Sequence, residues 1–427
     1  MKSHTYRALM LASSQRKSLR HPRFTRSMAS HLFNSPLPMS PYRCDVDAEP
    51  LHRYQPGGLH PLELGDVLKN GRYEIIHKLG WGGYSTAWAA KDKKKNQYVA
   101  IKVLVSELSH QHEIKILQAI STLPNGHPGR ARLNQMLDYF SLPGPNGTHD
   151  CLVLQLLGPG VADIVESYCE DNRLPAPIAK SFARQALQGL DFLAHHSITH
   201  GDIHTRNLAI EIPNLHSLDE RSFISMLGQP QTGAVKRMDG KALDNNIPYH
   251  IVRPARFQNA RFLLSHNPSI RIIDFGEAFL KNRAPRTLHT PLALRPPEAI
   301  FGDILSQRVD LWSAGCLIFE LVTGQPPFDT VMLTTPILVQ QMMEFATDVL
   351  PPRWELKWKA MAENLSREEE SLTLHQWLEE VYFDGNKHPE FSVEDIAKVA
   401  ELISKMLRFE PSKRATASQL LTHDWFR

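Results

Sequence analysis

Two short motifs place the strongest constraint on how this chain folds. Residues 200–207 read His-Gly-Asp-Ile-His-Thr-Arg-Asn, and Asp-Phe-Gly follows at residues 274–276. The apolar runs beside them, at 208–210 and 272–273, indicate short strands that hold the first motif as a loop. A chain with these motifs is expected to bring an acid and an amide of one loop close to an acid of another.

The residue types in these motifs suit the transfer of a phosphoryl group from a metal-bound nucleotide. Such a transfer needs a carboxylate that orients the incoming hydroxyl group and accepts its proton, together with hard oxygen ligands for Mg²⁺. We predict Asp202 as the catalytic carboxylate, and Asn207 and Asp274 as the metal ligands. Either motif alone also occurs by chance, so the prediction depends on the rest of the chain.

A glycine-rich stretch upstream adds a nucleotide-binding feature. It follows a strand-like run at residues 73–78. Glycines lack a Cβ atom, so the backbone N–H groups of a glycine-rich hairpin can approach phosphate oxygens closely. A pair of glycines alone is more often a simple turn. The residues predicted to cover the nucleotide are Leu79, Gly80, Trp81, Gly82, Gly83, Tyr84 and Ser85.

A lysine follows at the spacing of a neighbouring strand. Residues 99–102 read Val-Ala-Ile-Lys, a pattern in which the apolar residues are buried and Lys102 reaches the α- and β-phosphates. The amphipathic stretch 110–120 predicts a helix, and its Glu113 is the expected partner of Lys102. A lone Lys or Glu is usually a solvated surface charge, but the order and spacing of these motifs favour a catalytic pair.

In this order the motifs resemble those of the eukaryotic protein kinases. The resemblance also covers Pro-Pro-Glu at 296–298, Asp-x-Trp-Ser-x-Gly at 310–315 and Arg414, and it spans most of the chain. It implies an α+β, bilobal fold, with a small β-rich lobe and hinge at 70–157 and a large, mainly helical lobe at 158–427. It also implies ATP and Mg²⁺ as cofactors, and transfer of the γ-phosphate to Ser or Thr of proteins.

By the same resemblance, the end of the small lobe leads into a hinge that binds adenine through its backbone, with Leu154 at the gatekeeper position. Ala87 and Ala209 are small where the family usually has larger aliphatic residues. This difference favours a roomier nucleotide slot, unless neighbouring side chains fill the space. The further residues expected to contact the nucleotide are Ala87, Ala100, Gln155, Leu157 and Ala209.

Three charged residues take structural roles by this resemblance. Glu298 and Arg414 would form an ion pair that ties the activation segment to the large lobe, and Asp310 would brace the catalytic loop. Breaking a buried pair of this kind costs about 3–5 kcal/mol. The alternative is that each of the three is an ordinary surface charge.

One departure from the family pattern concerns regulation. Gly201 stands where an arginine usually precedes the catalytic acid, so no cation is present there to bind an activation-loop phosphate. We therefore expect no control by loop phosphorylation. Thr287 and Thr290 are the only hydroxyl residues between Asp274 and Glu298, and we interpret Thr290 as a substrate-side residue rather than a switch.

A second departure concerns catalysis. His204 stands where protein kinases usually have a lysine that stabilises the transferring phosphoryl group. Histidine is shorter and only partly charged near neutral pH. We predict His204 as a catalytic residue beside Asp202, Lys102 and Glu113, and we expect slower catalysis or help from another cation such as Arg206.

The same substitutions leave two other hypotheses open. An inactive pseudokinase that acts as a binding scaffold would tolerate both Gly201 and His204. A small-molecule phosphotransferase is the other hypothesis, because His-Gly-Asp-x-His at 200–204 resembles the motif of aminoglycoside-type kinases. The motifs of the large lobe favour a protein kinase over the second hypothesis.

The stretch between Asn207 and Asp274 is long for a protein kinase and predicts an inserted loop near 217–267. With Leu-Gly-Trp-Gly at 79–82 and the segment 54–61, it makes the chain resemble the fungal branch of the SR-protein kinases. That resemblance implies protein substrates, with Arg-Ser-rich proteins as the specific expectation. Residues 363–395 are rich in acids that would suit guanidinium groups, although a solvated helix face explains them equally well.

Composition argues against several other classes of protein. The chain has 427 residues, 42% hydrophobic and 22% charged, with a net charge of +3 that is too small to argue for nucleic acid. No run of about 18 apolar residues predicts a transmembrane helix. The four cysteines lack metal-ligand or disulfide spacing. We expect a monomer in the cytoplasm or nucleus, without membrane or direct nucleic-acid partners.

The N-terminal region has a different composition. Residues 1–44 are rich in Lys, Arg and Ser and lack Asp and Glu, which is typical of a mitochondrial transit peptide. Prolines would interrupt an amphipathic helix there, so we favour a disordered basic tail and keep a mitochondrial location as the alternative. Residues 45–69 predict a mostly irregular lead into the first strand of the small lobe.

Overall fold

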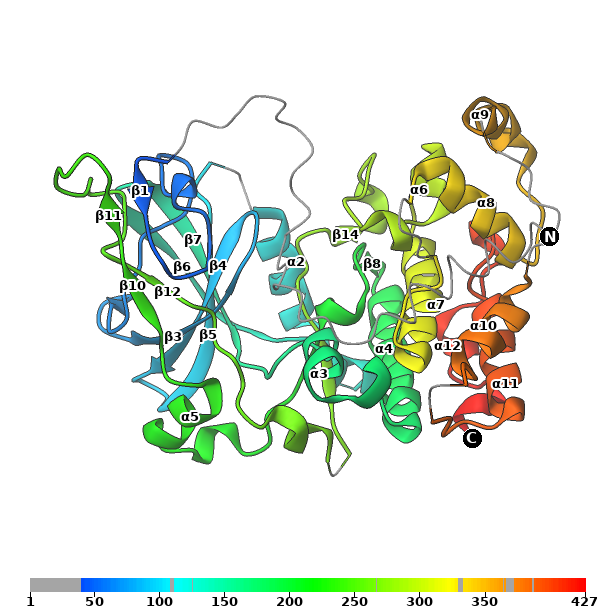
Figure 1. The fold of residues 1–427 in the computed structure, drawn as a ribbon, viewed down its shortest axis with the longest axis horizontal. Helices are drawn as coiled ribbons and strands as arrows, with labels where there is room; N and C mark the ends of the chain where they lie inside the picture. The colour runs from blue at the N-terminus through cyan, green and yellow to red at the C-terminus, as the bar shows by residue number, and fades with distance from the viewer. Residues whose placement is uncertain are drawn as a thin grey trace.

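The computed structural model describes residues 40–107, 111–124, 126–265, 267–328, 333–363, 365, 372–385 and 388–427, so most of the predicted basic tail lies outside the described residues. A β-rich lobe lies on one side of the molecule and a helical lobe on the other (Figure 1). The prediction of an α+β, bilobal fold is confirmed.

The small lobe is built on a six-stranded sheet with the order β2-β3-β4-β5-β7-β6, in which all neighbours are antiparallel. Side chains alternate between the two faces of a strand, and Tyr73, Ile75, Trp88, Ile101 and Val153 bury one face in a shared core. The helix α2 (Gln111–Thr122) lies between this sheet and the large lobe (Figure 1). The strands are β2 (Val67–Leu68), β3 (Tyr73–Trp81), β4 (Ser85–Asp92), β5 (Gln97–Leu104), β6 (Met136–Gly144) and β7 (Gly147–Gln155).

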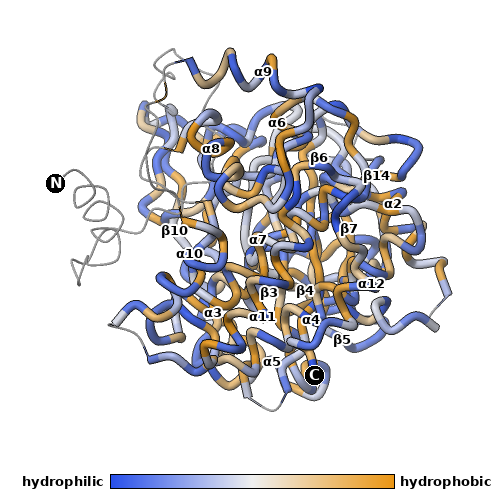
Figure 2. The backbone as a smooth tube through the Cα atoms, turned by 90° about the vertical axis from the view of Figure 1, so that its right-hand side faces the viewer, coloured by the Kyte–Doolittle hydropathy of each residue, from blue (hydrophilic) through white to orange (hydrophobic). Residues whose placement is uncertain are grey.

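The large lobe surrounds α7 (Arg308–Thr323), whose side chains are buried on nearly every side. A helix that is apolar all round belongs in a core, and α4 (Ala176–His195) and α11 (Val393–Ser404) pack against it. Figure 2 shows hydrophobic residues concentrated in the elements at the middle of this lobe. Its other helices are α3 (Val161–Tyr168), α6 (Pro297–Phe301), α8 (Thr335–Phe345), α9 (Pro352–Ala362), α10 (Leu374–Tyr382) and α12 (Ala417–Leu420).

Two short strand pairs hold the loops that carry the predicted catalytic residues. β8 (Ile198–Thr199) pairs with β14 (Phe279–Leu280), and β9 (Leu208–Ile210) pairs with β13 (Ile270–Ile272). The motif at 200–207 is therefore a loop between β8 and β9, as the apolar runs beside it predict. Because β13 lies next to β9, the residues that follow β13 are carried to the same loop.

The insertion between β9 and β13 folds against the small lobe and contains regular structure, so it is more than the loop that the sequence suggests. It includes α5 (Glu220–Leu227), β10 (Thr232–Ala234), β11 (Lys236–Arg237) and β12 (His250–Val252). Tyr98 of β5 stacks on Phe223 of α5, with the ring centroids 3.8 Å apart. In Figure 1 these green elements lie beside the strands of the small lobe.

The lead segment and the insertion form one layer on the small lobe. Residues 45–69 are mostly irregular, as predicted, apart from the 3₁₀ turn η1 (Leu51–Arg53) and β2. Tyr54 and Leu59 of the lead share a buried cluster with Ile251 of the insertion, and Asn246 donates to the Tyr54 carbonyl at 2.9 Å. The strand β1 (Tyr42–Arg43) pairs with β11. The insertion therefore connects the large lobe to the outer surface of the small lobe.

Candidate active site

The backbone of the catalytic loop is held by Asp310 at the start of α7. Its two carboxylate oxygens accept hydrogen bonds from the backbone N–H groups of His200 at 2.7 Å and Gly201 at 2.8 Å. Burial raises the pKa of Asp310 to about 7, although the two N–H donors oppose this shift. The His200 ring bonds to the carbonyl of Ile273 and meets the ring of Phe275 edge-on. The predicted brace is present, and it joins this loop to the Asp-Phe-Gly segment.

Gly201 has a conformation that few other residues adopt. Its φ of 82° lies in the left-handed region, and a Cβ atom there would come within 2.6 Å of the carbonyl oxygen of Glu277. The Gly201 carbonyl accepts a hydrogen bond from the buried hydroxyl of Thr290 at 2.9 Å. Gly201 therefore lets the activation segment pack directly on the catalytic loop, in addition to removing the cation that the family usually has.

Asp202 has one carboxylate oxygen engaged and one without a partner. Its Oδ2 accepts from Asn207 Nδ2 at 3.1 Å and lies 3.3 Å from His204 Nε2. Its Oδ1 is buried and has no hydrogen-bond partner in the described chain. A buried oxygen of this kind normally has a partner, so it suits the hydroxyl group of an incoming substrate.

His204 is used inside the loop. Its Nδ1 accepts from the backbone N–H of Arg206 at 3.2 Å, and its Nε2 lies 3.3 Å from Asp202 Oδ2 and 3.2 Å from Asn207 Nδ2. The side chain is 13% exposed. The guanidinium of Arg206 lies 3.8 Å from Asp163 of α3 and is 69% exposed. The imidazole thus contacts the carboxylate that the sequence predicts as catalytic.

Lys102 joins the small lobe to the predicted metal ligand. Its Nζ lies 2.8 Å from Glu113 of α2 and 2.9 Å from Asp274. Burial disfavours the charge of Lys102, but the carboxylates of Asp274 and Glu113 outweigh burial and raise the pKa. Lys102 in turn lowers the pKa of Asp274 to about 2. The two lobes therefore meet through a charged bridge that keeps Asp274 ionised.

The donor atoms of Asn207 and Asp274 fit a hard cation. Asn207 Nδ2 bonds to the carbonyl and carboxylate of Asp202, which leaves its amide oxygen free of that contact. Ile273 donates to the Asn207 carbonyl at 2.9 Å and so brings Asp274 beside it, with a φ of 61°. Amide and ionised carboxylate oxygens are ligands that Mg²⁺ prefers. No cluster of three His, Cys, Asp or Glu ligands occurs among the described residues.

The glycine-rich hairpin between β3 and β4 is open. The turn closes with a bond from the Gly82 N–H to the Ser85 carbonyl at 2.9 Å, and Tyr84 at its tip is 63% exposed. An added Cβ atom at Gly80, Gly82 or Gly83 would meet nothing within 4 Å. Among the described residues no steric contact demands these glycines, which is compatible with close approach by a phosphate.

The predicted adenine contacts surround the hinge. Ala87 pairs with Lys102 across β4 and β5, and both Ala87 and Ala100 are partly exposed. Ala209 is 3% exposed, and its strand is pinned to the hinge by bonds between residues 158–159 and Ile210. Among the described residues, the Leu157 backbone N–H has no hydrogen-bond partner, whereas that of Gln155 donates to Gln135. The Leu157 N–H is therefore a donor at the hinge that a ligand can use.

The predicted ion pair of the activation segment is present and fully buried. Arg414 donates to the two oxygens of Glu298 at 2.6 and 2.7 Å, and both side chains are at most 1% exposed. A two-bond fork of this kind is the strongest geometry for a carboxylate and a guanidinium. It anchors α6, and with it the end of the activation segment, to the large lobe.

Several contacts around the site were missed by sequence reasoning. Thr205 donates to Glu320 of α7 at 2.8 Å, and His289 pairs with Glu277 at 2.9 Å. Arg53 of the lead segment donates to the carbonyl of Gly83 in the hairpin. No motif signals these contacts, because each joins residues far apart in the sequence or in an irregular segment.

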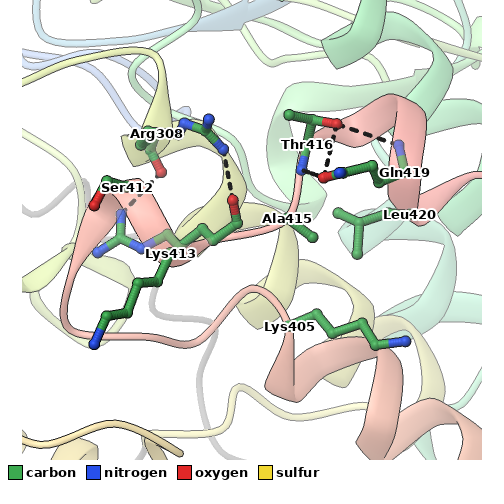
Figure 3. A pocket seen from close by; sticks show the side chains of 9 residues that line it. Arg308, Lys405, Ser412, Lys413, Ala415, Thr416, Gln419 and Leu420 are labelled. Atoms are coloured by element: carbon green, nitrogen blue, oxygen red, sulfur yellow. Dashed lines mark hydrogen bonds between the residues drawn. The ribbon is translucent and has the colours of Figure 1, made fainter.

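A cavity of about 550 Å³ lies in the large lobe, away from these residues (Figure 3). Its cations do not converge: Lys405 and Lys413 point apart in Figure 3, and Lys405 pairs with Glu401 at 2.7 Å. Thr416 and Gln419 bond to each other at the start of α12. We therefore assign this cavity no part in the chemistry.

The acidic region at 363–395 lies partly outside the described residues. The structure describes Glu363, Glu379, Glu380, Asp384, Glu390, Glu394 and Asp395. Several of these acids have local partners: Glu390 accepts from the Ala176 N–H, Asp395 belongs to the cap of α11, and Glu394 pairs with Lys398. In Figure 1, α10 and α11 lie on the far side of the large lobe from the small lobe.

Comparison with known proteins places the chain in a family. A model of the protein kinase domain matches residues 73–218 and 258–426, and the gap between the two ranges falls in the insertion. The chain therefore belongs to the protein kinase family, as the sequence motifs predict.

No helix among the described residues is long and apolar enough to cross a membrane.

Within that family the chain is similar to SR-protein kinases, which confirms the narrower resemblance. It is 27% identical over 417 residues to a serine/threonine-protein kinase SRPK of Physarum polycephalum, with 89% of this chain and 92% of that protein covered. It is 27% identical to protein kinase dsk1 of Schizosaccharomyces pombe, with 88% and 84% covered. The match to human SRSF protein kinase 3 is 38% identical but covers 39% of this chain and 30% of that protein.

Proposed function

We propose that this protein is an active, ATP- and Mg²⁺-dependent kinase that phosphorylates Ser or Thr of proteins. The buried Oδ1 of Asp202, which has no partner in the described chain, carries the proposal. It lies on the one carboxylate that Asn207 and His204 orient, next to the bridge between Lys102 and Asp274. A scaffold that binds without catalysis has no need of an oriented, unpaired carboxylate.

Each side chain has a task in this proposal. Asp202 orients the substrate hydroxyl and accepts its proton, and the imidazole of His204 fixes the position of the carboxylate. Lys102, held by Glu113, would bind the α- and β-phosphates. Asn207 and Asp274 would hold Mg²⁺, which neutralises charge on the phosphate oxygens when bound. The free N–H of Leu157 would bind adenine.

The contacts of His204 also favour slower phosphoryl transfer than in kinases with a lysine at this position. The lysine usual at this position reaches the transferring phosphoryl group, whereas this imidazole is held by contacts with Asp202, Asn207 and the backbone N–H of Arg206. Arg206, the other cation of the loop, has its ion-pair contact with Asp163 of α3 and none with Asp202 among the described residues. This feature is the one that favours the second candidate function, a pseudokinase scaffold, and measured turnover decides between them.

The finer points of the proposal concern substrate and setting. Protein substrates follow from family membership, and one relative is named for its action on SRSF proteins. Arg-Ser-rich substrates are one form of the proposal. The acidic region gives this form little support, because Glu390, Glu394 and Asp395 already have partners within the chain. A monomer in the cytoplasm or nucleus is proposed as the setting.

A labelled-phosphate assay tests the proposal. The purified protein is incubated with γ-labelled ATP and Mg²⁺ and with a panel of Ser and Thr peptides, Arg-Ser peptides and small alcohols. We expect label in peptides, none after removal of Mg²⁺ with a chelator, and at least about a hundredfold less with Asp202→Ala. Label in small alcohols alone would favour the small-molecule phosphotransferase. Binding of ATP without any label in excess of the Asp202→Ala background would favour the scaffold.

A further inference from the structure

The rim of the catalytic loop presents a cation at the point where a substrate must approach. The 3₁₀ turn η4 (Thr205–Asn207) directs Thr205 and Asn207 inward, where both are buried, and Arg206 outward with 69% of its side chain exposed. Arg206 stands four residues after Asp202 in this turn. A residue beside the phosphorylated Ser or Thr would therefore come near this guanidinium.

The only ion-pair partner of Arg206 among the described residues is Asp163, and the pair is weak. The two charged groups are 3.8 Å apart, and Asp163 is itself 61% exposed. Exposed pairs at this distance contribute little because water screens both charges. A carboxylate or phosphate of a substrate can replace this contact with a two-bond fork, which is the stronger geometry for a guanidinium.

The activation segment, which contacts the catalytic loop at both ends of the stretch 281–289, adds three more exposed cations. Lys281, Arg283 and Arg286 lie between β14, which pairs with β8 beside the catalytic loop, and Thr290, which bonds to Gly201. None of the three cations has a carboxylate within ion-pair distance among the residues that the structure describes.

The acids of this segment are already engaged. Glu277 pairs with His289, Glu298 is forked by Arg414, and Asp274 is bonded to Lys102. The charge that the segment offers to an approaching substrate is therefore positive. An arginine-rich peptide would bring its guanidinium groups toward like charges, and an anionic peptide would not.

We propose that Arg206, with the basic stretch 281–286, makes this kinase select Ser or Thr that is flanked by anionic side chains, either carboxylates or phosphoserines. This inference rests on the proposed kinase function and names the substrate class for the same site. It differs from the expectation of Arg-Ser-rich substrates, because it follows from the charges beside the catalytic loop rather than from the distant acidic region at 363–395.

The test compares kcat/KM for four peptides that share one central Ser and carry, on both sides of it, alanine, glutamate, phosphoserine or arginine. With the wild-type protein we expect the glutamate or phosphoserine peptide to exceed the arginine peptide at least about tenfold, and the preference to shrink at high salt. The two anionic peptides separate an acidic sequence from an already phosphorylated one. A preference for the arginine peptide would overturn the inference.

Substitutions then assign the preference to a residue. Arg206→Glu should reduce the ratio of anionic to arginine peptide by about tenfold, while Arg206→Lys retains its direction. Lys413→Glu makes the same charge change on an exposed residue of the large lobe and should leave the ratio unaltered. An unchanged ratio in Arg206→Glu, with thermal unfolding near that of the wild type, would overturn the assignment.

The outcomes for function and for specificity are distinct. If no peptide is phosphorylated above the Asp202→Ala background, the proposed function fails and this inference fails with it. If peptides are phosphorylated but the arginine peptide is preferred, only the inference about substrate charge fails.

Discussion

Among the described residues, the small and large lobes each contain one fully buried ion pair, and each pair ties a separate segment to its lobe. In the large lobe, Glu298 and Arg414 tie the activation segment to the helical core. In the small lobe, Glu49 and Lys78 tie the lead segment to the strand that enters the glycine-rich hairpin. The side chains of both pairs are at most 1% exposed. Equal burial does not make the two pairs equivalent.

The chemistry of the two cations differs. Arg414 forks its carboxylate and also donates to the carbonyls of Arg308 and Arg408, and a guanidinium in a protein stays charged. Lys78 has one carboxylate oxygen of Glu49 and the ring of Trp88 at 5.0 Å. Burial lowers the pKa of Lys78, although Glu49 opposes this shift. The small-lobe pair can therefore relieve a broken contact by losing a proton, and the large-lobe pair cannot.

The largest effect is expected from breaking the large-lobe pair. Glu298→Ala should lower the free energy of unfolding by about 3–5 kcal/mol, because it leaves Arg414 buried without its carboxylate. Denaturant unfolding measures this change. The control, Arg353→Ala, removes exposed pairs with Asp303 and Glu410 and should cost less than about 1 kcal/mol. Similar losses in both variants would show that burial of the pair does not matter.

Breaking the small-lobe pair is expected to lower the free energy of unfolding by a smaller amount. Glu49→Ala should lower the free energy of unfolding by about 1–3 kcal/mol, since Lys78 can become neutral instead of remaining a buried charge. It should also raise KM for ATP, because Lys78 immediately precedes the glycine-rich hairpin. Glu74→Ala breaks an exposed pair with Lys93 in the same sheet and serves as the control. A loss as large as that of Glu298→Ala would contradict the distinction between the two cations.

Asp310 extends the comparison to a buried carboxylate that has no cation beside it. Burial raises its pKa from 3.8 to about 7, so the folded protein holds a proton that the unfolded chain releases. The stability from this group is present at low pH and falls as pH rises from about 4 to 7. The unfolding free energies of the wild type and Asp310→Asn are compared across this range. The fall should be shallower in the variant, and identical slopes would contradict the raised pKa.

The smallest effect is expected at the contact between the lead segment and the hairpin. Arg53→Ala removes the donor to the Gly83 carbonyl and should raise KM for ATP about twofold with little change in kcat, as expected for one partly exposed hydrogen bond. Arg43→Ala removes an exposed arginine of β1, whose one ion-pair partner among the described residues is Asp45, and should change neither constant. A matching drop in kcat would indicate a structural effect instead.

The sequence predicts the parts of the site that depend on short, ordered motifs. The structure brings together Asp202 with Asn207, Lys102 with Glu113 and Asp274, and Glu298 with Arg414. These residues lie at fixed spacings from apolar strands and helices, so their placement follows from the elements that carry them.

Other features depend on contacts between distant segments and leave no local pattern. Glu49 and Lys78 look like surface charges in sequence, and their pairing requires the lead segment to fold over the sheet. The packing of the insertion on the small lobe, through Tyr98 and Phe223, is of the same kind. The left-handed conformation of Gly201 and the use of the His204 ring follow from the backbone of the loop.

The effect of substituting Asp202 on turnover is the most direct test of phosphoryl transfer by this site. Single-peptide kcat values are compared for the wild type, Asp202→Ala and His204→Lys under saturating ATP and Mg²⁺. We expect measurable turnover in the wild type, a loss of about 10²–10⁴-fold in Asp202→Ala, and a gain in His204→Lys because the lysine can reach the phosphoryl group. A wild-type rate no higher than that of Asp202→Ala would contradict catalysis by this protein.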